Sequence, residues 1–172
     1  LAAYIDGGYK ADTKMRTMTF PFKERAVLIP IELVFTVKPF LLLALIFFFL
    51  SGLGGPGGYL SNLTDFGFFA VAALAGAVLA GAVLSPALLP YLPGRAFSLK
   101  GVSIGIVTAI GFLFWRDINF AAWPDRIEAI SWLLLIPAIA SYLAMNFTGA
   151  STYTSLSGVK KEMRFALPVQ IG

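Results

Sequence analysis

FFAVAALAGAVLAGAVLSPALL, at positions 68–89, is the stretch of this sequence that decides its fold. It contains no charged residue, and Ser85 carries its only hydroxyl group. The hydrocarbon core of a bilayer is about 30 Å thick, and an α-helix needs roughly 20 apolar residues to cross it. The stretch therefore predicts a transmembrane helix.

Further apolar segments flank this one, and no charged residue occurs in 39–64, 66–94, 101–115 or 129–159. In the whole chain 58% of the residues are hydrophobic and 13% are charged, whereas a soluble domain is about a quarter charged. We therefore predict an all-α fold, a polytopic membrane helix bundle. The third helix is long enough because Lys100 can snorkel to the interface. The helices are expected near 26–50, 68–89, 97–115 and 127–145.

Turn-forming residues separate the predicted helices. The segment 51–65 is rich in glycine around Pro56, and 90–93 is rich in proline. Pro30 and Pro39 lie inside the first helical segment. Because proline lacks the N–H that continues a helix, they predict an interfacial part followed by a crossing part.

The two ends of the sequence differ from its apolar middle. Residues 1–25 are polar and mixed in charge, and we expect them to be the tail of an upstream cytoplasmic domain with its linker. Residues 26–172 are then the transmembrane domain. Residues 165–172 are apolar around Pro168, and we expect them to open a fifth helix that is truncated.

The distribution of Lys and Arg predicts the orientation. Five lie in residues 1–25, two follow helix two, and three follow helix four, whereas the other side has only Arg116 and Arg126, offset by Asp117 and Asp125. The positive-inside rule places both ends and the second loop in the cytoplasm, with the chain in the cytoplasmic membrane. The net charge of +4 then reflects topology and contact with anionic lipid rather than nucleic-acid binding.

Small residues recur at four-residue spacing in helix two. Ala73, Ala77, Gly81 and Ser85 form one stripe, and helix three repeats the pattern at 101, 105 and 109. Small residues let helix backbones approach closely in lipid. The helix-two stripe is either an oligomer interface or a packing surface within one bundle, and we predict that it faces another helix of the same chain.

Few residues in the membrane segments carry chemistry. The sequence has no Cys and no His, which removes the thiolate and imidazole ligands and the commonest nucleophile and general base. Glu32 and Lys38 are the only ionisable residues inside the predicted segments. They are either functional, as buried ionisable groups often are, or located near the cytoplasmic interface.

The run NFTGASTYTSLSGVKKEMR, at 146–164, is unusually rich in hydroxyl groups and ends in basic residues. Ser157 is predicted to cap a helix beginning at Gly158. Hydroxyls beside a helix N-terminus suit an anion or a polar docking partner; the alternative is an ordinary interfacial re-entry loop. The first three residues form a glycosylation sequon, whose cytoplasmic side argues against its use. The candidate docking residues are Asn146, Thr148, Ser151, Thr152, Thr154, Ser157, Lys160, Lys161 and Arg164.

Two stretches carry a resemblance to a known family. They are GGYKADTKMRTMTFPFKERAVLIPIELVFTVKP at 7–39 and NFTGASTYTSLSGVKKEMRFALP at 146–168. The first resembles the junction between the corrinoid and membrane domains of the mercury-methylating corrinoid proteins. The second resembles the run before the last membrane helix of that family. The resemblance covers essentially the whole chain.

The resemblance implies a function for a longer parent protein. In that family an N-terminal domain binds a cobalamin-type corrinoid, and a cap-helix cysteine ligates cobalt and helps transfer a methyl group to Hg(II). A small ferredoxin with two 4Fe–4S clusters keeps the cobalt reduced, and the membrane domain has five helices. The present sequence has no such cysteine, so no catalytic residue is carried over. We expect the chain itself to bind neither cobalamin nor Hg(II) tightly.

Three functions follow from these observations. The chain is a membrane anchor and docking platform for a corrinoid methyltransferase domain, a small transporter or channel, or a structural subunit of another complex. Metal transport generally uses Cys, His or Met, and the predicted helices offer only Met145, near an end. The sequence therefore favours the anchor, with the lipid bilayer, the upstream corrinoid domain and the ferredoxin as its partners.

Overall fold

The structure is a computed structural model that describes residues 2–10, 21–150 and 156–171, and within these residues every regular element is a helix. After a short helix α1 (Ala2–Asp6), four helical segments are long and apolar enough to cross a membrane. The segments are α2 (Phe22–Ser51), a composite second span (Tyr59–Ala87), α6 (Phe97–Arg116) and α7, which is apolar over Trp123–Phe147 and ends at Ala150. The predicted all-α membrane bundle is confirmed.

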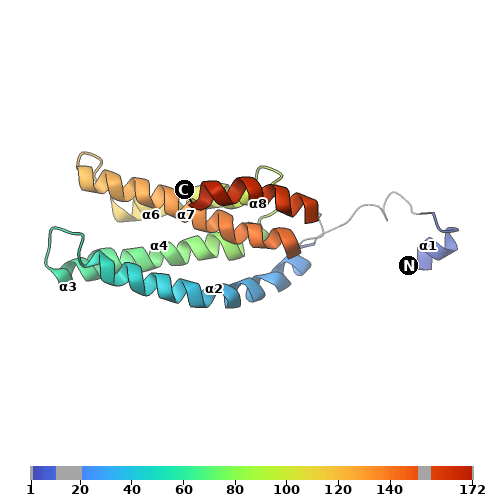
Figure 1. Ribbon diagram of the computed structural model, residues 1–172, viewed down its shortest axis with the longest axis horizontal. Coiled ribbons are helices and arrows are strands. Elements are labelled where there is room, and N and C mark those ends of the chain that lie inside the picture. The colour runs from blue at the N-terminus through green and yellow to red at the C-terminus, as the bar shows by residue number, and fades with distance from the viewer. Residues whose placement is uncertain (1, 11–20, 151–155, 172) are drawn as a thin grey trace.

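The four spans run up and down along one common axis, and α7 is the central helix (Figure 1). It contacts α2, the second span, α6 and the last helix α8 (Leu156–Ile171). Much of α2, in contrast, stays on the outside of the bundle, where Val34 and Phe35 are exposed. Exposed apolar side chains are the normal surface of a helix that faces lipid.

The second span begins at Tyr59, well before the predicted residue 68. The turn before it is short because one side chain organises the glycine-rich segment. Nδ2 of Asn62 donates to the carbonyl oxygens of Gly52, Gly55 and Gly57 at 3.3, 3.1 and 3.0 Å. Its Oδ1 accepts from the N–H of Gly57 at 3.1 Å. The buried Asn62 amide thus satisfies the polar backbone of the turn, and the helix starts directly after it.

The second span is not a uniform α-helix. It consists of α3 (Tyr59–Asn62), the π-helical η2 (Leu63–Gly67), α4 (Phe68–Val78), the π-helical η3 (Leu79–Leu84) and α5 (Ser85–Ala87). Segments of π-helix are rare and change the direction in which the following side chains point. Directly after η3, Ser85 donates both its backbone N–H and its hydroxyl to the Ala80 carbonyl, the hydroxyl at 2.9 Å.

The first span is one continuous helix, so the two prolines do not divide it into separate helices. The interfacial position of its first part stays a prediction. Pro30 and Pro39 both lie inside α2. Each proline removes one backbone N–H, while the remaining hydrogen bonds of the helix stay in place. The Thr36 hydroxyl also donates to the Glu32 carbonyl at 2.8 Å, which adds a local bond between the two prolines.

The small-residue stripe faces other helices of the same chain, as predicted. Ala73 and Ala77 are completely buried, and a Cβ added to Gly81 would lie 2.7 Å from Leu143 Cβ in α7. In α6, a Cβ on Gly101 would lie 2.6 Å from the Cα of Ser141, also in α7. These contacts bring three helix backbones close together.

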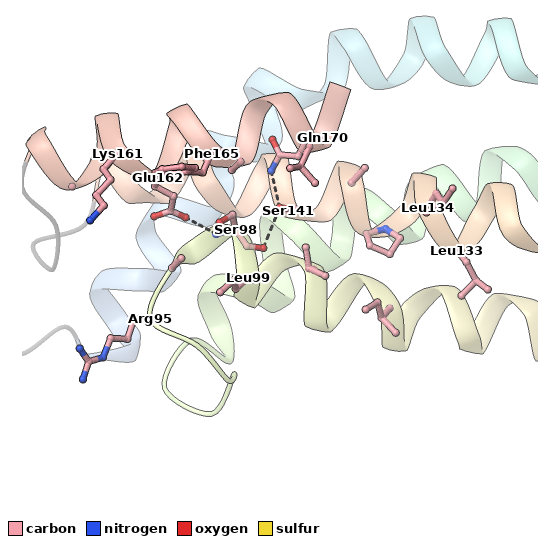
Figure 2. A pocket seen from close by; sticks show the side chains of 18 residues that line it. Arg95, Ser98, Leu99, Leu133, Leu134, Ser141, Lys161, Glu162, Phe165 and Gln170 are labelled. Atoms are coloured by element: carbon pink, nitrogen blue, oxygen red, sulfur yellow. Dashed lines mark hydrogen bonds between the residues drawn. The ribbon is translucent and has the colours of Figure 1, made fainter. Parts of the chain in front are cut away.

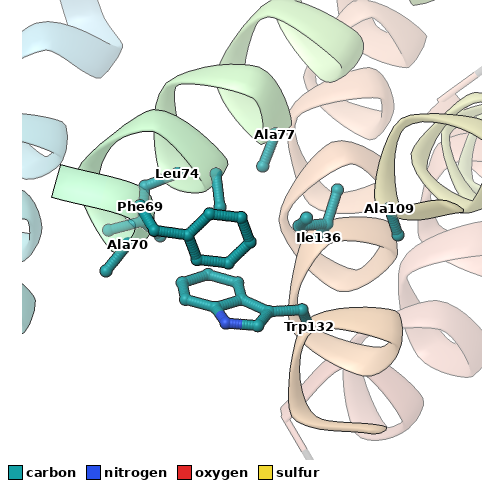
Figure 3. Packing of buried hydrophobic residues seen from close by; sticks show 8 residues of the cluster. Phe69, Ala70, Leu74, Ala77, Ala109, Trp132 and Ile136 are labelled. Atoms are coloured by element: carbon teal, nitrogen blue, oxygen red, sulfur yellow. The ribbon is translucent and has the colours of Figure 1, made fainter. Parts of the chain in front are cut away.

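An aromatic cluster fills the other half of the bundle. The Phe69 ring of α4 meets the Trp132 ring of α7 edge-to-face, with ring centroids 5.7 Å apart (Figure 3). Phe69 also meets Phe112 of α6 at 6.0 Å. Ile136 and Ala109 complete the buried core beside them. The bundle therefore combines close backbone contacts with a compact aromatic layer.

Helix α8 runs back along α7 (Figure 1) and contains the residues predicted to open a fifth helix. It begins at Leu156, earlier than the predicted opening at Phe165, and Pro168 lies inside it. Ser157 therefore lies within the helix, and its predicted role as the N-cap is wrong. Helix α7 also extends past its predicted end at residue 145, so Asn146 and Thr148 are helical.

The packing of α6 on α7 predicts different outcomes at two glycines. A Cβ on Gly105 would lie 2.5 Å from Pro137 Cα, whereas one on Gly111 would meet nothing within 4 Å. Gly105→Ala should lower the free energy of unfolding by about 1–3 kcal/mol through overpacking. Gly111→Ala should leave it unchanged or raise it by up to about 1 kcal/mol, because alanine favours the helix. Denaturation of both variants in the same detergent checks this, and equal effects would contradict the close helix contact.

Candidate functional site

The two ends of the bundle differ in charge. We call the end where α2 and α8 begin the basic end (Figure 1). The basic residues of the segments at this end are Lys23, Arg25, Arg95, Lys100, Lys160, Lys161 and Arg164. The opposite end mixes acidic and basic side chains from the second span, α6 and α7. This asymmetry agrees with the Lys and Arg count along the sequence.

Two cations of the basic end hold the C-terminus of the second span. Nη1 of the buried Arg25 donates to the carbonyl oxygens of Pro86 and Ala87, each at 3.0 Å. Nζ of Lys100 donates to the Leu89 carbonyl at 2.6 Å, so this side chain does reach back to the end of the bundle. The last carbonyls of a helix lack helical donors and carry partial negative charge. Arg25 and Lys100 therefore have a structural role.

The structure brings two of the predicted candidates together. Nδ2 of Asn146 donates to Oε1 of Glu32 at 2.6 Å, which ties α7 to α2. The contact joins residues from opposite parts of the sequence, and neither the spacing nor the composition predicted it. Glu32 is half-buried beside α7, whereas Lys38 does not take part in this contact.

Lys38 lies exposed on the outer surface of α2. It is thirteen residues after Arg25, which places it about 20 Å along the helix from the basic end at about 1.5 Å per residue. Half of the hydrocarbon core is about 15 Å thick, so Lys38 would lie deeper than the interface if Arg25 marks the membrane surface. The interfacial location of Lys38 stays an untested alternative. A lysine at this depth is costly unless it snorkels or meets an acidic group from outside the bundle.

The run at 146–164 is described in part. Ser151, Thr152 and Thr154 lie outside the described residues, and Thr148 is placed only by its backbone in α7. Within α8, Ser157 and the basic side chains are exposed; the latter are Lys160, Lys161 and Arg164. The exposed basic part of the predicted docking run therefore gathers on the first turns of one helix.

Glu162, which was not among the predicted candidates, caps the N-terminus of α6 from α8. Its Oε1 accepts from the backbone N–H of Ser98 at 2.6 Å, in the first turn of α6. Helix α6 has no side-chain cap at its own N-terminus, so this carboxylate satisfies one of the N–H groups left open there. The sequence did not indicate this role, because Glu162 stands in a run of charged residues and its partner Ser98 is 64 residues away.

A chain of hydrogen bonds continues from this point into the bundle (Figure 2). The hydroxyl of the buried Ser141 in α7 donates to the Ser98 carbonyl at 3.0 Å. Nε2 of Gln170 in α8 donates to the Ser141 oxygen at 2.7 Å. These bonds fix α8 against α6 and α7 along its length, so the basic residues on its first turns are held in a defined position.

The opposite end is held by Arg116, another residue whose role the sequence did not reveal. Its Nη1 and Nη2 donate to Oδ1 and Oδ2 of Asp65 at 2.8 and 3.1 Å, and its Nε donates to Glu128 at 3.3 Å. The guanidinium carbon also lies 4.6 Å from the centroid of the Phe66 ring. Arg116 is thus neutralised by residues far along the chain rather than by the adjacent Asp117. The earlier start of the second span places Asp65 within a helix, and Lys100 and Glu128 already lie inside the predicted third and fourth helices. The prediction that Glu32 and Lys38 are the only ionisable residues in the membrane segments is therefore wrong.

Metal-ligating side chains do not gather among the described residues. No group of three or more His, Cys, Asp or Glu side chains able to hold a metal ion occurs among them. The sequence has neither the cysteine nor a histidine that could ligate cobalt. The buried polar side chains of the basic end instead join helices to one another.

The fold and its ends define a polytopic helical membrane protein. Comparison with protein-family models, with curated proteins and with solved structures finds no match to this chain.

The Arg116 contacts predict a double-mutant cycle with Asp65. Arg116→Gln should lower the free energy of unfolding by about 1.5–3 kcal/mol, because hydrogen bonds to charged groups contribute in that range. Asp65→Asn should lower the free energy of unfolding less in the Arg116→Gln background than in the wild type. Denaturation of the two single variants and the double variant measures this coupling energy. Arg126→Gln is the matched control, since Arg126 is exposed and donates only to loop carbonyls. Additive effects of the first pair would exclude the ion pair.

Proposed function

We propose that this chain is the membrane-anchoring and docking domain of a corrinoid-dependent methyltransferase that transfers a methyl group to Hg(II). The proposal rests on the sequence resemblance for the reaction and on the basic end for the docking role. The observation that carries it is the position of the exposed basic residues of α8, at the same end of the bundle as the start of α2. An upstream domain joined to α2 would meet this surface.

The basic surface suits an acidic electron-transfer partner. Lys160, Lys161 and Arg164 are exposed, whereas Arg25 and Lys100 are occupied by backbone carbonyls. Exposed charges steer an oppositely charged partner and speed its encounter, and salt weakens the effect. In this proposal the basic end faces the cytoplasm of the cell, and a small ferredoxin docks there beside the corrinoid domain.

The packing of the bundle gives no support to the transporter alternative. Its centre is filled by the aromatic cluster and by the small-residue contacts of α7. Met145 is buried near the end of α7, and Lys38 points outward rather than into the bundle. Ionisable residues of transport pathways usually face the bundle interior or a water-filled cavity.

Replacement of the three exposed basic residues tests the docking role. In the full-length protein, Lys160→Gln, Lys161→Gln and Arg164→Gln together should slow ferredoxin association several-fold at low salt and reduce Hg(II) methylation. The difference from wild type should shrink as salt rises, because screening removes the same attraction. Binding kinetics and methylmercury formation across a salt series measure both effects.

Lys23→Gln is the control for this variant, because Lys23 is an exposed basic residue at the start of α2. Membrane insertion of each variant is checked first, since basic residues also set topology. Wild-type binding and methylation by the triple variant at every salt concentration would refute the docking role. Failure of the full-length wild-type protein to methylate Hg(II) would refute the proposed function itself.

The proposed anchor carries no cofactor of its own. Purified residues 1–172 should bind neither cobalamin nor Hg(II) with submicromolar affinity, because the sequence has no thiol or imidazole to ligate either metal. Isothermal titration with cobalamin and with Hg(II) measures this. Stoichiometric, tight binding of either ligand would mean that the chain contributes directly to the metal chemistry.

A further inference from the structure

A large groove lies between α6, α7 and α8, separate from the exposed docking residues Lys160 and Arg164. Its volume is about 920 Å³, within the range of about 300–1,000 Å³ that is usual for ligand pockets. Most of its lining is aliphatic or aromatic, and the groove opens to the outer surface of the bundle, where Leu134 and Val169 are exposed. An apolar molecule in the surrounding membrane could therefore enter it from the side.

The charged residues of the groove gather at one end, whereas Ser141 and Gln170, which bond to each other, are polar residues further along it. Arg95, Lys161 and Glu162 lie at the basic end, and the aliphatic lining continues away from them (Figure 2). Both cations are exposed. The Glu162 carboxylate accepts the Ser98 N–H, so its charge is partly compensated at the N-terminus of α6. The entrance of the groove thus favours a negatively charged group.

The depth of the groove matches one leaflet of a bilayer. Its lining on α6 extends from Ser98 to Ile106, which corresponds to about 12 Å at about 1.5 Å per residue. One leaflet contributes about 15 Å of hydrocarbon. A molecule with an anionic head and an acyl tail could therefore place the head between Arg95 and Lys161 and the tail along α6 and α7.

We infer that this groove binds an anionic phospholipid of the bilayer. The phosphate is held by Arg95 and Lys161, and one acyl chain fills the space between α6, α7 and α8. The charge at the entrance selects an anionic headgroup over a zwitterionic one, because basic pockets between membrane helices attract anionic lipid. A lipid bound here would join α8 to the rest of the bundle. The inference shares Lys161 with the docking residues, but it does not depend on the methyltransferase proposal, because lipid binding by the chain is measured without the corrinoid domain or the ferredoxin.

Thermal denaturation of the purified protein in a neutral detergent tests the inference. Dioleoylphosphatidylglycerol should raise the melting temperature by about 2–4 °C, because a ligand that binds only the folded state stabilises it. Dioleoylphosphatidylcholine should raise it clearly less. Inorganic phosphate at the same concentration separates binding of a lipid from binding of a free anion, and it should have no effect.

Variants locate the effect in the groove. Arg95→Gln with Lys161→Gln should reduce the phosphatidylglycerol shift to the phosphatidylcholine level. Lys23→Gln with Lys160→Gln removes the same charge from exposed positions outside the groove and should keep the full shift. Ala138→Phe should fill the groove from α7 and abolish the shift for both lipids.

Native mass spectrometry of the wild-type protein gives a second readout that needs no variant. It should retain one phosphatidylglycerol molecule in preference to phosphatidylcholine in an equimolar mixture. An equal shift in the two double variants, an equal effect of inorganic phosphate, or no lipid preference in the mixture would overturn the inference. So would a dimer that Ala138→Phe converts to a monomer, because the groove would then be an interface between two copies.

Discussion

The close approach of α6 and the second span to α7 is the contact on which the rest of the bundle depends. Lipid is as apolar as leucine, so burial of apolar surface does not drive membrane helices together, and close packing must do so. Gly81, Gly101 and Gly105 provide that packing, because a side chain at any of them would collide with α7. Once these backbones are in contact, Phe69 and Trp132 meet and fill the wider half of the bundle.

Polar groups then fix each end of the bundle in a different way. At the opposite end, Arg116 joins three helical segments through two carboxylates. At the basic end, Arg25 and Lys100 bind carbonyl groups, and Glu162 binds an N–H group. In both cases the side chain pairs with a backbone group or an opposite charge near the point where a helix begins or ends. The charges at the ends are therefore largely part of the fold.

The exposed charges that have no such structural partner are therefore the better candidates for binding another molecule. Lys160, Lys161 and Arg164 are not needed to complete a helix end, and they lie on a helix that Gln170 and Glu162 hold in place. A docking surface has to be positioned as well as charged, because orientation limits the rate of specific association. The same helix α8 closes one side of the apolar groove. Helix α8 thus connects the proposed docking role to the proposed lipid site.

The sequence by itself determined the fold class, the number of spans, the small-residue packing and the concentration of basic charge at one end. These properties depend on local composition and on spacing within single segments, which a sequence displays directly. It did not predict the start of the second span, because Asn62 organises the turn through bonds to residues that precede it. The Glu32–Asn146 contact, the Arg116 cluster and the apolar groove were decided only by the tertiary structure. Each joins side chains from different helices, and their partners depend on how those helices pack.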